Sequence, residues 1–342
     1  MFVPFLALNP GAIRQNRFTE TIMEPSEGLR YVLLGVWERF DTLWYIHIAN
    51  HGYDVPEAAV YYPLYPILVR VFSTLLHQEL VAALLISTVS SFFLFWGLQK
   101  LLSLDLPSSL VRRALILCGV WPCGFIFFAG YAESLVLALI IWSVYFARIG
   151  KWWCSGLLGL LAGLAKAVGA LVAVPLSILA WREKTLRPLP AVLSVLGPAA
   201  FFLFLRLSGH PPLSEVYSKY WETEMTWPWI TFSHSIRQVI QDHNIGVGLN
   251  LSILLLTFAL AFSRKLRLEY FLYALGTLLL VLVKKSAPAN QEWGRYVLII
   301  FPAYANLGQL LEDGAVFAAS VLFLAFVNAF LLWTFLEWLL VV

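Results

Sequence analysis

The sequence predicts an all-α, polytopic integral membrane helical bundle, and two observations carry this prediction. Hydrophobic residues fill 60% of the 342 positions and charged residues only 13%, whereas soluble domains carry about a quarter charged residues. The apolar runs are long and continuous and do not alternate with a period of two, which favours helices over strands. Helices also satisfy their own backbone hydrogen bonds inside lipid. We therefore expect one membrane domain, residues 1–342, with roughly 9–11 transmembrane helices.

Apolar runs of about 20 residues identify the candidate spans. The run over 153–181 is interrupted by Lys166, which predicts two short half-helices. Residues 58–77 contain Pro63, Pro66 and Arg70, and predict a short helix that lies in the membrane interface and does not cross. The other candidate spans are 80–99, 111–129, 131–147, 189–207, 245–263, 268–283, 295–311 and 315–340.

Lysine and arginine are unevenly distributed among the loops. The dense set holds 11 of them in 28 positions, and the sparse set holds nine in 101 positions. Short basic loops face the cytoplasm, so the sparse set is predicted to be extracytoplasmic. The dense set is 100–113, 148–151, 182–187 and 264–267, and the sparse set is 30–79, 206–244 and 284–295. A first loop at 37–79, with short interfacial helices, and an aromatic loop at 208–244 then face the same side; residues 1–36 form a poorly defined N-terminal segment.

Charge and cysteine content exclude several classes of partner. The formal net charge is only +3, and no basic run or zinc-like Cys/His spacing indicates nucleic acid. The three cysteines lie within or beside apolar segments and do not form a disulfide framework. We expect no nucleic-acid partner and no cofactor.

The stretch "WERFDTLWYIHIANHGYD" concentrates ionisable groups among aromatic residues at 37–54. A carboxylate such as Asp41, at the mouth of a helical bundle, can act as a general base if its pKa is tuned. The alternative is that Asp41 caps a helix. His47 and His51 stand four apart, as metal ligands on one helical face do, but no third ligand is evident, so polar packing is favoured and no metal is expected.

Three further charges are unusual in so apolar a chain. Glu133 either anchors substrate in a polar cavity or is stabilised by the dipole at a helix start, and the two roles are compatible. Lys166 needs an anion such as a phosphate, or it snorkels at a turn. Arg295, followed by Tyr296 and preceded by Lys284, Lys285 and Glu292, suits a phosphate or marks an ordinary helix end.

Five stretches of the sequence, in order, resemble the motifs of the second GPI-anchor mannosyltransferase-like (PIG-V-like) family. The family consists of polytopic glycosyltransferases of the GT-C fold that use polyprenyl-phosphate sugars. The resemblance covers residues 37 to 311. The stretches are "ERFDTLWYIHIANHGYD", "VYYPLYPILVR", "YAESL", "GLLAGLAKAVGALV" and "GRYVLIIFPAY".

The resemblance implies a role for several positions. Asp41 matches the family's catalytic acid, with Phe40 in place of a tryptophan, and Lys166 replaces the arginine of a Thr-Arg pair, which keeps the charge but loses the planar fork. Lys166 and Arg295 would bind the donor phosphate. The residues expected to bind substrate or support the site are Arg39, Trp44, Tyr45, His47, Tyr53, Tyr65, Tyr131, Glu133 and Tyr296.

The function implied is inverting transfer of a hexose, mannose by resemblance, from a polyprenyl- or dolichyl-phosphate donor to a lipid-linked or extracytoplasmic glycan acceptor. The protein would be a multi-pass protein of a bacterial plasma membrane, in contact with membrane lipid, with an extracytoplasmic active site. Two alternatives stay open. One is a transporter or flippase for a lipid-linked or anionic substrate, with Lys166 and Glu133 as coupling groups. The other is a noncatalytic relative with the same fold.

Overall fold

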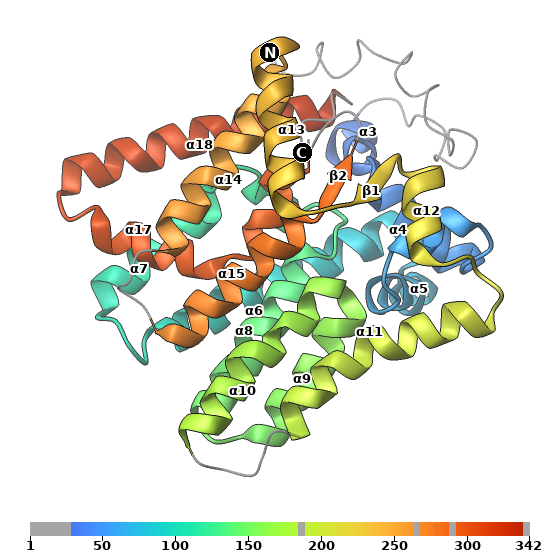
Figure 1. The fold of residues 1–342 in the computed structure, drawn as a ribbon, viewed down its shortest axis with the longest axis horizontal. Coiled ribbons are helices and arrows are strands. Elements are labelled where there is room, and N and C mark those ends of the chain that lie inside the picture. The colour runs from blue at the N-terminus through green and yellow to red at the C-terminus, as the bar shows by residue number, and fades with distance from the viewer. Residues whose placement is uncertain (1–28, 184–188, 263–266, 287–291, 338–342) are drawn as a thin grey trace.

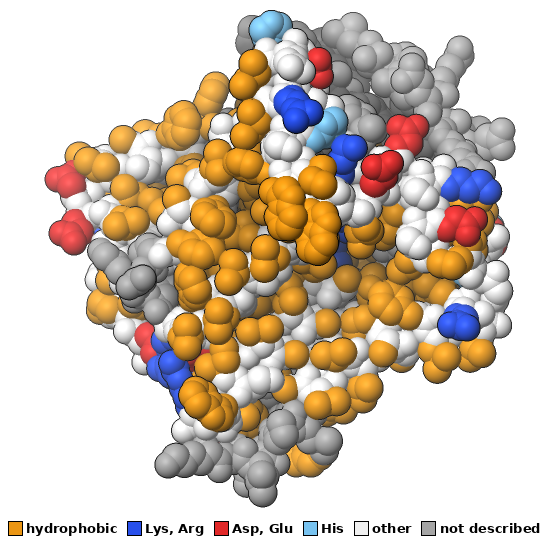
Figure 2. All heavy atoms as spheres, in the orientation of Figure 1, with side chains coloured by type: hydrophobic (Ala, Val, Ile, Leu, Met, Phe, Trp, Pro, Cys, Tyr) orange, Lys and Arg blue, Asp and Glu red, His pale blue; other side chains and the backbone are white. Residues whose placement is uncertain are grey.

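In the computed structural model of the 342-residue chain, residues 29–183, 189–262, 267–286 and 292–337 are described. Helices make up most of this part of the chain and pack against one another as a bundle (Figure 1). The predicted all-α class is confirmed. Figure 2 shows hydrophobic side chains over most of one face, with charged side chains gathered near its margins, as expected where lipid covers the middle of a bundle.

The first loop folds into short helices. Gly52, with φ +72, ends α4, since glycine adopts the left-handed conformation without steric cost. Helix α5 begins just after Pro63 and leaves Ile67, Val71 and Leu75 exposed, so the short helix predicted within 58–77 is present. The elements are α3 (Leu29–Leu33), η1 (Gly35–Trp37), α4 (Asp41–His51), η2 (Pro56–Val60) and α5 (Leu64–Leu76).

Helices α6 and α8 pack side by side, and α6 leaves Val89, Phe92 and Trp96 exposed on its other face. The continuous span expected at 111–129 is wrong, because α7 ends at Val120 and a short 3-10 helix follows it. Pro122 explains the break: the residue before a proline is driven out of the helical region, and Trp121 is extended at φ −56 and ψ 145. The elements are α6 (Glu79–Leu102), α7 (Ser108–Val120), η3 (Gly124–Phe127) and α8 (Glu133–Arg148).

The segment around Lys166 is discontinuous, as predicted. Helix α9 (Trp152–Ala165) stops at Lys166, whose backbone is extended, and η4 (Ala167–Val172) and α10 (Ala173–Arg182) follow. The chain then turns back through α11 (Leu189–Leu207), which packs closely on α9. Gly169 is required here, because a Cβ at this position would lie 2.0 Å from the Ala162 carbonyl oxygen. The break at Lys166 is therefore held by tight backbone packing.

The C-terminal half contributes more helices and a small ribbon. The span expected at 295–311 is wrong as one helix: it divides near Ile300, because Pro302 lacks an N–H and begins a new helix. The elements are α12 (Leu213–Tyr220), β1 (Thr223–Met225), α13 (Pro228–Gln241), α14 (Ile245–Ala261), α15 (Leu268–Leu282), β2 (Lys284–Ser286), α16 (Trp293–Tyr296), η5 (Val297–Ile299), α17 (Phe301–Leu310) and α18 (Gly314–Leu336).

Strands β1 and β2 form an antiparallel ribbon that the sequence did not predict. Thr223 pairs with Ser286, Glu224 with Lys285, and Met225 with Lys284. The ribbon ties the aromatic loop at 208–244 to the segment that precedes Arg295. Two loops that are far apart in the sequence therefore meet at one end of the bundle (Figure 1).

Two helices, α6 and α18, are long and apolar enough to cross a membrane by length and composition. Six shorter apolar helical segments accompany them among the described residues. They are Leu64–Leu76, Trp152–Ala165, Ala167–Arg182, Ala191–Leu207, Ile245–Ala261 and Leu268–Leu282. The number of spans and the sidedness of the loops stay predictions.

Candidate active site

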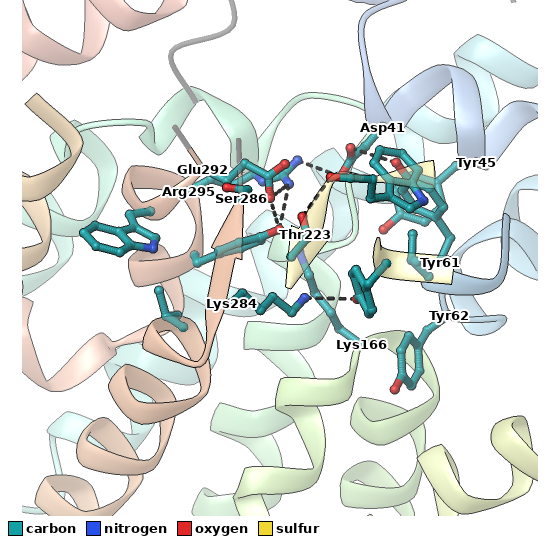
Figure 3. A pocket seen from close by; sticks show the side chains of 16 residues that line it. Asp41, Tyr45, Tyr61, Tyr62, Lys166, Thr223, Lys284, Ser286, Glu292 and Arg295 are labelled. Atoms are coloured by element: carbon teal, nitrogen blue, oxygen red, sulfur yellow. Dashed lines mark hydrogen bonds and ion pairs between the residues drawn. The ribbon is translucent and has the colours of Figure 1, made fainter. Parts of the chain in front are cut away.

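A cavity of about 280 Å³ opens where the first loop, the break at Lys166, the β1–β2 ribbon and α16 meet (Figure 3). Five ionisable side chains and a set of aromatic rings line it. The ionisable residues are Asp41, Lys166, Lys284, Glu292 and Arg295. The aromatic residues include Tyr45, Tyr61, Tyr217, Trp221 and Tyr296. The site predicted from separate stretches of sequence therefore has a physical space in the fold.

Asp41 is the first residue of α4 and its side chain faces the cavity. The capping position belongs to Phe40, which has no side-chain capping bond, so the capping alternative for Asp41 is wrong. One Asp41 carboxylate oxygen accepts a hydrogen bond from Arg295 at 2.6 Å, and the other accepts one from the Tyr61 hydroxyl at 3.2 Å. Phe40 holds a left-handed φ of 45°, a strained backbone of the kind found beside functional residues.

Arg295 is buried and lies between two acids. Its Nη1 donates to Asp41, and its Nε lies 3.5 Å from the Glu133 carboxylate. The guanidinium also stacks over the rings of Tyr131 and Tyr296, at 5.3 and 5.1 Å from their centroids. Charge and aromatic faces together compensate for the cost of burying this cation.

Lys166, at the break between α9 and η4, reaches Glu133 at the start of α8. The two side chains form an ion pair of 2.5 Å, with Glu133 almost fully buried at 1% side-chain exposure. Lys166 is therefore anchored internally and does not snorkel. Glu133 is also the first residue of α8, as its helix-start role requires, and it faces Lys166 and Arg295. Its role as an anchor for substrate stays a prediction.

The electrostatics of the site prepare Asp41 to accept a proton. Burial raises the pKa of Asp41; Arg295 opposes that shift, Glu133 reinforces it and Lys166 opposes it again. Burial also works against the charge on Arg295, but Asp41 and its other neighbours raise the pKa of Arg295 well above its ordinary value. The arginine thus stays charged while the nearby acid becomes a stronger base.

A second, smaller cavity of about 70 Å³ adjoins the first. It shares Lys166, Lys284, Arg295 and Tyr296 with the larger cavity. The rest of its wall is mainly apolar, with contributions from Val168, Leu280 and Ile299, and Val281 lines both cavities. The polar site therefore continues into a space suited to hydrocarbon.

Several of the expected supporting residues lie at or beside the cavity. Tyr45 lines it, and the Tyr131 hydroxyl accepts a hydrogen bond from the Asp41 backbone N–H at 3.3 Å. Trp44 stacks on Tyr61, with ring centroids 5.5 Å apart and planes 18° apart. Tyr296 lines both cavities.

Six expected residues line neither cavity: Trp44 and Tyr131, whose contacts are given above, and Arg39, His47, Tyr53 and Tyr65. Arg39 donates to the Leu336 carbonyl oxygen and the Tyr31 hydroxyl, so it ties the first loop to the end of α18. His47 bonds Asp54 at 2.8 Å. The hydroxyls of Tyr53 and Tyr65 donate to the carbonyl oxygens of Tyr61 and Ala83. These contacts fix the first loop, and the sequence alone could not separate such residues from those that face the cavity.

Sequence reasoning missed other residues of the cavity wall. Tyr61 lies in the stretch "VYYPLYPILVR", so its neighbours offered a signal, but only the fold brings its hydroxyl to Asp41. Thr223 enters the wall on β1, and Trp221 lies two residues before that strand. The β1–β2 ribbon itself had no signal in the sequence. Within the described ranges, no group of three or more His, Cys, Asp or Glu residues could hold a metal ion.

No family model matches the chain. A stretch of 149 residues is 30% identical to GPI alpha-1,6-mannosyltransferase 2 of Mus musculus and covers 40% of this chain but only 30% of the mouse protein. A crystal structure of ArnT from Cupriavidus metallidurans bound to undecaprenyl phosphate aligns with a TM-score of 0.49 and 14% identity, over 86% of this chain and 59% of that one. The chain is thus similar in sequence, over the matched stretch, to a GPI mannosyltransferase, which bears out the resemblance of its motifs to the PIG-V-like family.

Proposed function

We propose that this protein is a PIG-V-like glycosyltransferase of the GT-C type that moves a hexose, with inversion, from a polyprenyl- or dolichyl-phosphate donor. The acceptor would be lipid-linked or an extracytoplasmic glycan. One observation carries the proposal: Asp41 lies against Arg295, beside Lys166, in a polar cavity that continues into an apolar one. The similarity to a mannosyltransferase over 149 residues supports mannose as the sugar.

In the proposed reaction, Asp41 takes the proton of the acceptor hydroxyl as that oxygen attacks the anomeric carbon. The bond between this carbon and the donor phosphate oxygen breaks, and the lipid phosphate leaves with the electron pair. Attack on the face opposite the leaving group inverts the configuration. Cations at Lys166 and Arg295 stabilise the charge that grows on the phosphate. The raised pKa of Asp41 favours proton uptake during the attack.

We further propose an integral protein of a bacterial plasma membrane, with the cavity on the extracytoplasmic side. Helix α8 supports this placement, because Glu133 at its start faces the cavity and Arg148 at its other end belongs to a basic loop. Basic loops favour the cytoplasmic side. The cavity then opens at the opposite end of the bundle.

The test is turnover by the purified protein in lipid nanodiscs. Undecaprenyl-phosphate mannose labelled in the sugar is supplied with a lipid extract of the source organism as the acceptor pool. We expect labelled lipid product and free undecaprenyl phosphate. Asp41→Asn should lower the rate by about 10²–10⁴-fold, while Asp54→Asn, which alters an acid outside the cavity wall, should leave the rate within a factor of two or so.

The same assay separates the proposal from its rivals. Transport of intact labelled donor across the bilayer, without cleavage of the sugar–phosphate bond, would support a flippase. Full turnover in Asp41→Asn would remove this acid from the mechanism. Absence of turnover in a folded wild-type protein, with every candidate donor sugar, would favour a noncatalytic relative.

A further inference from the structure

Three cations surround one aromatic ring in the cavity. The Nζ atoms of Lys166 and Lys284 lie 5.3 and 5.7 Å from the centroid of the Tyr296 ring, and the Arg295 guanidinium carbon lies 5.1 Å from it. Cations so close repel one another unless anions lie between them. The ring offers each of them only a weak attraction.

Two of the three cations already have carboxylate partners. Lys166 is paired with Glu133 at 2.5 Å, and Arg295 with Asp41 at 2.6 Å. Among the described residues, no carboxylate lies within 4.0 Å of the Lys284 ammonium group. Its contacts are the Tyr217 hydroxyl at 3.0 Å and the Tyr217 ring at 4.5 Å. Of the three cations around Tyr296, Lys284 is therefore the one whose described contacts are with neutral groups.

Lys284 also occupies the position at which the two cavities meet. It lines the polar cavity and the adjoining apolar one, and Figure 3 shows it extending from β2 toward the centre of the polar cavity. The ribbon keeps it there, because Lys284 pairs with Met225 on β1. The other acid in the wall, Glu292, is held by Arg295 and by the Tyr296 hydroxyl.

We propose that Lys284 binds the phosphate group of the lipid-linked donor. An anion that reaches Lys284 displaces no ion pair, whereas an anion at Lys166 or Arg295 must compete with a buried carboxylate. A phosphate placed at the junction would direct the start of its lipid chain toward the apolar cavity and its sugar into the polar cavity, near Asp41. This inference rests on the proposed function and adds to it a binding residue that holds the donor through the β1–β2 ribbon.

The neighbouring Lys285 provides a matched control. It lies on the same strand, but it pairs with Glu224 at 3.5 Å and does not line either cavity. Lys284→Gln and Lys285→Gln therefore remove the same charge from adjacent positions. Lys284→Arg keeps the charge at the junction.

The test is binding to the full-length protein in nanodiscs, followed by the change in intrinsic tryptophan fluorescence on titration. Trp221 and Trp293, in the wall of the polar cavity, contribute to that emission. The probes are undecaprenyl phosphate, undecaprenol and inorganic phosphate. We expect Lys284→Gln to weaken undecaprenyl phosphate binding roughly 10- to 100-fold, the range for loss of a charged hydrogen bond. Undecaprenol binding should stay unchanged in that variant, and Lys285→Gln should bind both lipids as the wild type does.

Inorganic phosphate should compete with undecaprenyl phosphate in the wild type and lose this effect in Lys284→Gln. If Lys284→Gln does not fold, Lys284→Arg is tested in its place. This variant keeps the charge, so it should still bind undecaprenyl phosphate more tightly than undecaprenol. Equal weakening by Lys284→Gln and Lys285→Gln, or no weakening by Lys284→Gln, would overturn this assignment while leaving the proposed enzyme intact. A wild-type protein that does not distinguish undecaprenyl phosphate from undecaprenol would instead overturn the proposed donor.

Discussion

Helix α8 joins two charged clusters of different character. At its start, Glu133 belongs to the site cluster, which we define as Asp41, Glu133, Lys166 and Arg295 with Lys284 beside them. At its end, Arg148 binds both carboxylate oxygens of Asp105, at 2.7 and 2.9 Å. That far-end cluster also includes Arg182, Arg267 and Glu269.

In the far-end cluster, each of the three arginines has a carboxylate partner. Arg182 pairs with Glu269 at 2.9 Å, and Arg267 bridges Asp105 and Glu269. These contacts join the loop after α6, the last residues of α8 and α10, and the start of α15, so they hold these elements together. In the site cluster, Lys284 has no carboxylate partner among the described residues and lies beside an open cavity. The two clusters therefore differ in the open space beside their cations and not in the presence of charge.

The largest expected effect follows from breaking the site cluster at Arg295. Arg295→Gln leaves Asp41 and Glu133 buried without this counter-ion, which should destabilise the fold by about 3–5 kcal/mol. It should also lower transfer by about 10²-fold or more, because the departing phosphate loses a stabilising charge. Thermal unfolding in detergent and turnover in nanodiscs measure the two losses. Adding Asp41→Asn should restore stability but not activity; a double variant as unstable as the single one would contradict the pairing.

Breaking the far-end cluster should affect stability alone. Arg148→Gln leaves Asp105 with its weaker partner Arg267, at 3.4 Å, and should cost about 2–3 kcal/mol. We expect unchanged donor KM and kcat below the unfolding temperature. Arg148→Lys keeps the charge but loses the bidentate bond to Asp105. Its stability should lie between that of the wild type and that of Arg148→Gln. A selective change in donor KM would show that the far end is coupled to the site.

A pH titration should separate the clusters a second time. Burial raises the pKa of Asp41, so its proton uptake on acidification, and the loss of transfer, begin above the usual carboxylate range. Burial of Asp105 works in the same direction, but Arg148 and Arg267 hold the pKa of Asp105 below its ordinary value. The stability from Asp105 is present above its unfolded pKa and is lost only as the pH falls through the lower folded value.

Rates and unfolding temperatures measured from neutral to acidic pH test this order. As the pH falls, we expect the transfer rate to decrease first, while the far-end cluster still contributes to the free energy of unfolding. Arg148→Gln should remove that acid-sensitive stability without moving the midpoint of the rate profile. Simultaneous loss of rate and stability in the wild type would contradict the separation.

The smallest effect should come from Glu38, an acid in neither cluster. Burial raises the pKa of Glu38 from 4.5 to about 7, although Arg39 and Arg30 oppose the shift. The folded state therefore keeps a proton that the unfolded chain releases, and stability declines as the pH rises between these values. Glu38→Gln should stabilise the protein by about 1–2 kcal/mol above pH 7, with no gain at pH 4.5. The measurement is the difference in unfolding temperature between Glu38→Gln and the wild type at each pH. The same difference at both pH values would contradict the raised pKa of Glu38.

Much of the fold could be predicted because a helix surrounded by lipid needs a long run of apolar residues, which is visible in the sequence. The break at Lys166 was visible as a charge in an apolar run, and the run at 189–207 coincides with α11. The runs at 111–129 and 295–311 were misread, because hydropathy alone ignores Pro122 and Pro302. The β1–β2 ribbon depends on contacts between distant loops, which no local pattern contains.

The site was partly visible for the same reason. Asp41, Lys166 and Arg295 stood out as charges near apolar segments, and the fold brings them to one cavity. Lys284 and Lys285 look equivalent in the sequence. Only strand geometry, in which successive side chains point to opposite faces, separates the one at the cavity from the one paired with Glu224.

The length of α8 has a consequence for how this chain can vary. One residue added to the 16 of this helix would rotate its two ends by about 100° relative to each other. Glu133 and Arg148 could then not both meet their present neighbours without rewinding a turn. Natural insertions and deletions in close relatives should therefore be absent from α8 and occur in the loops that flank it.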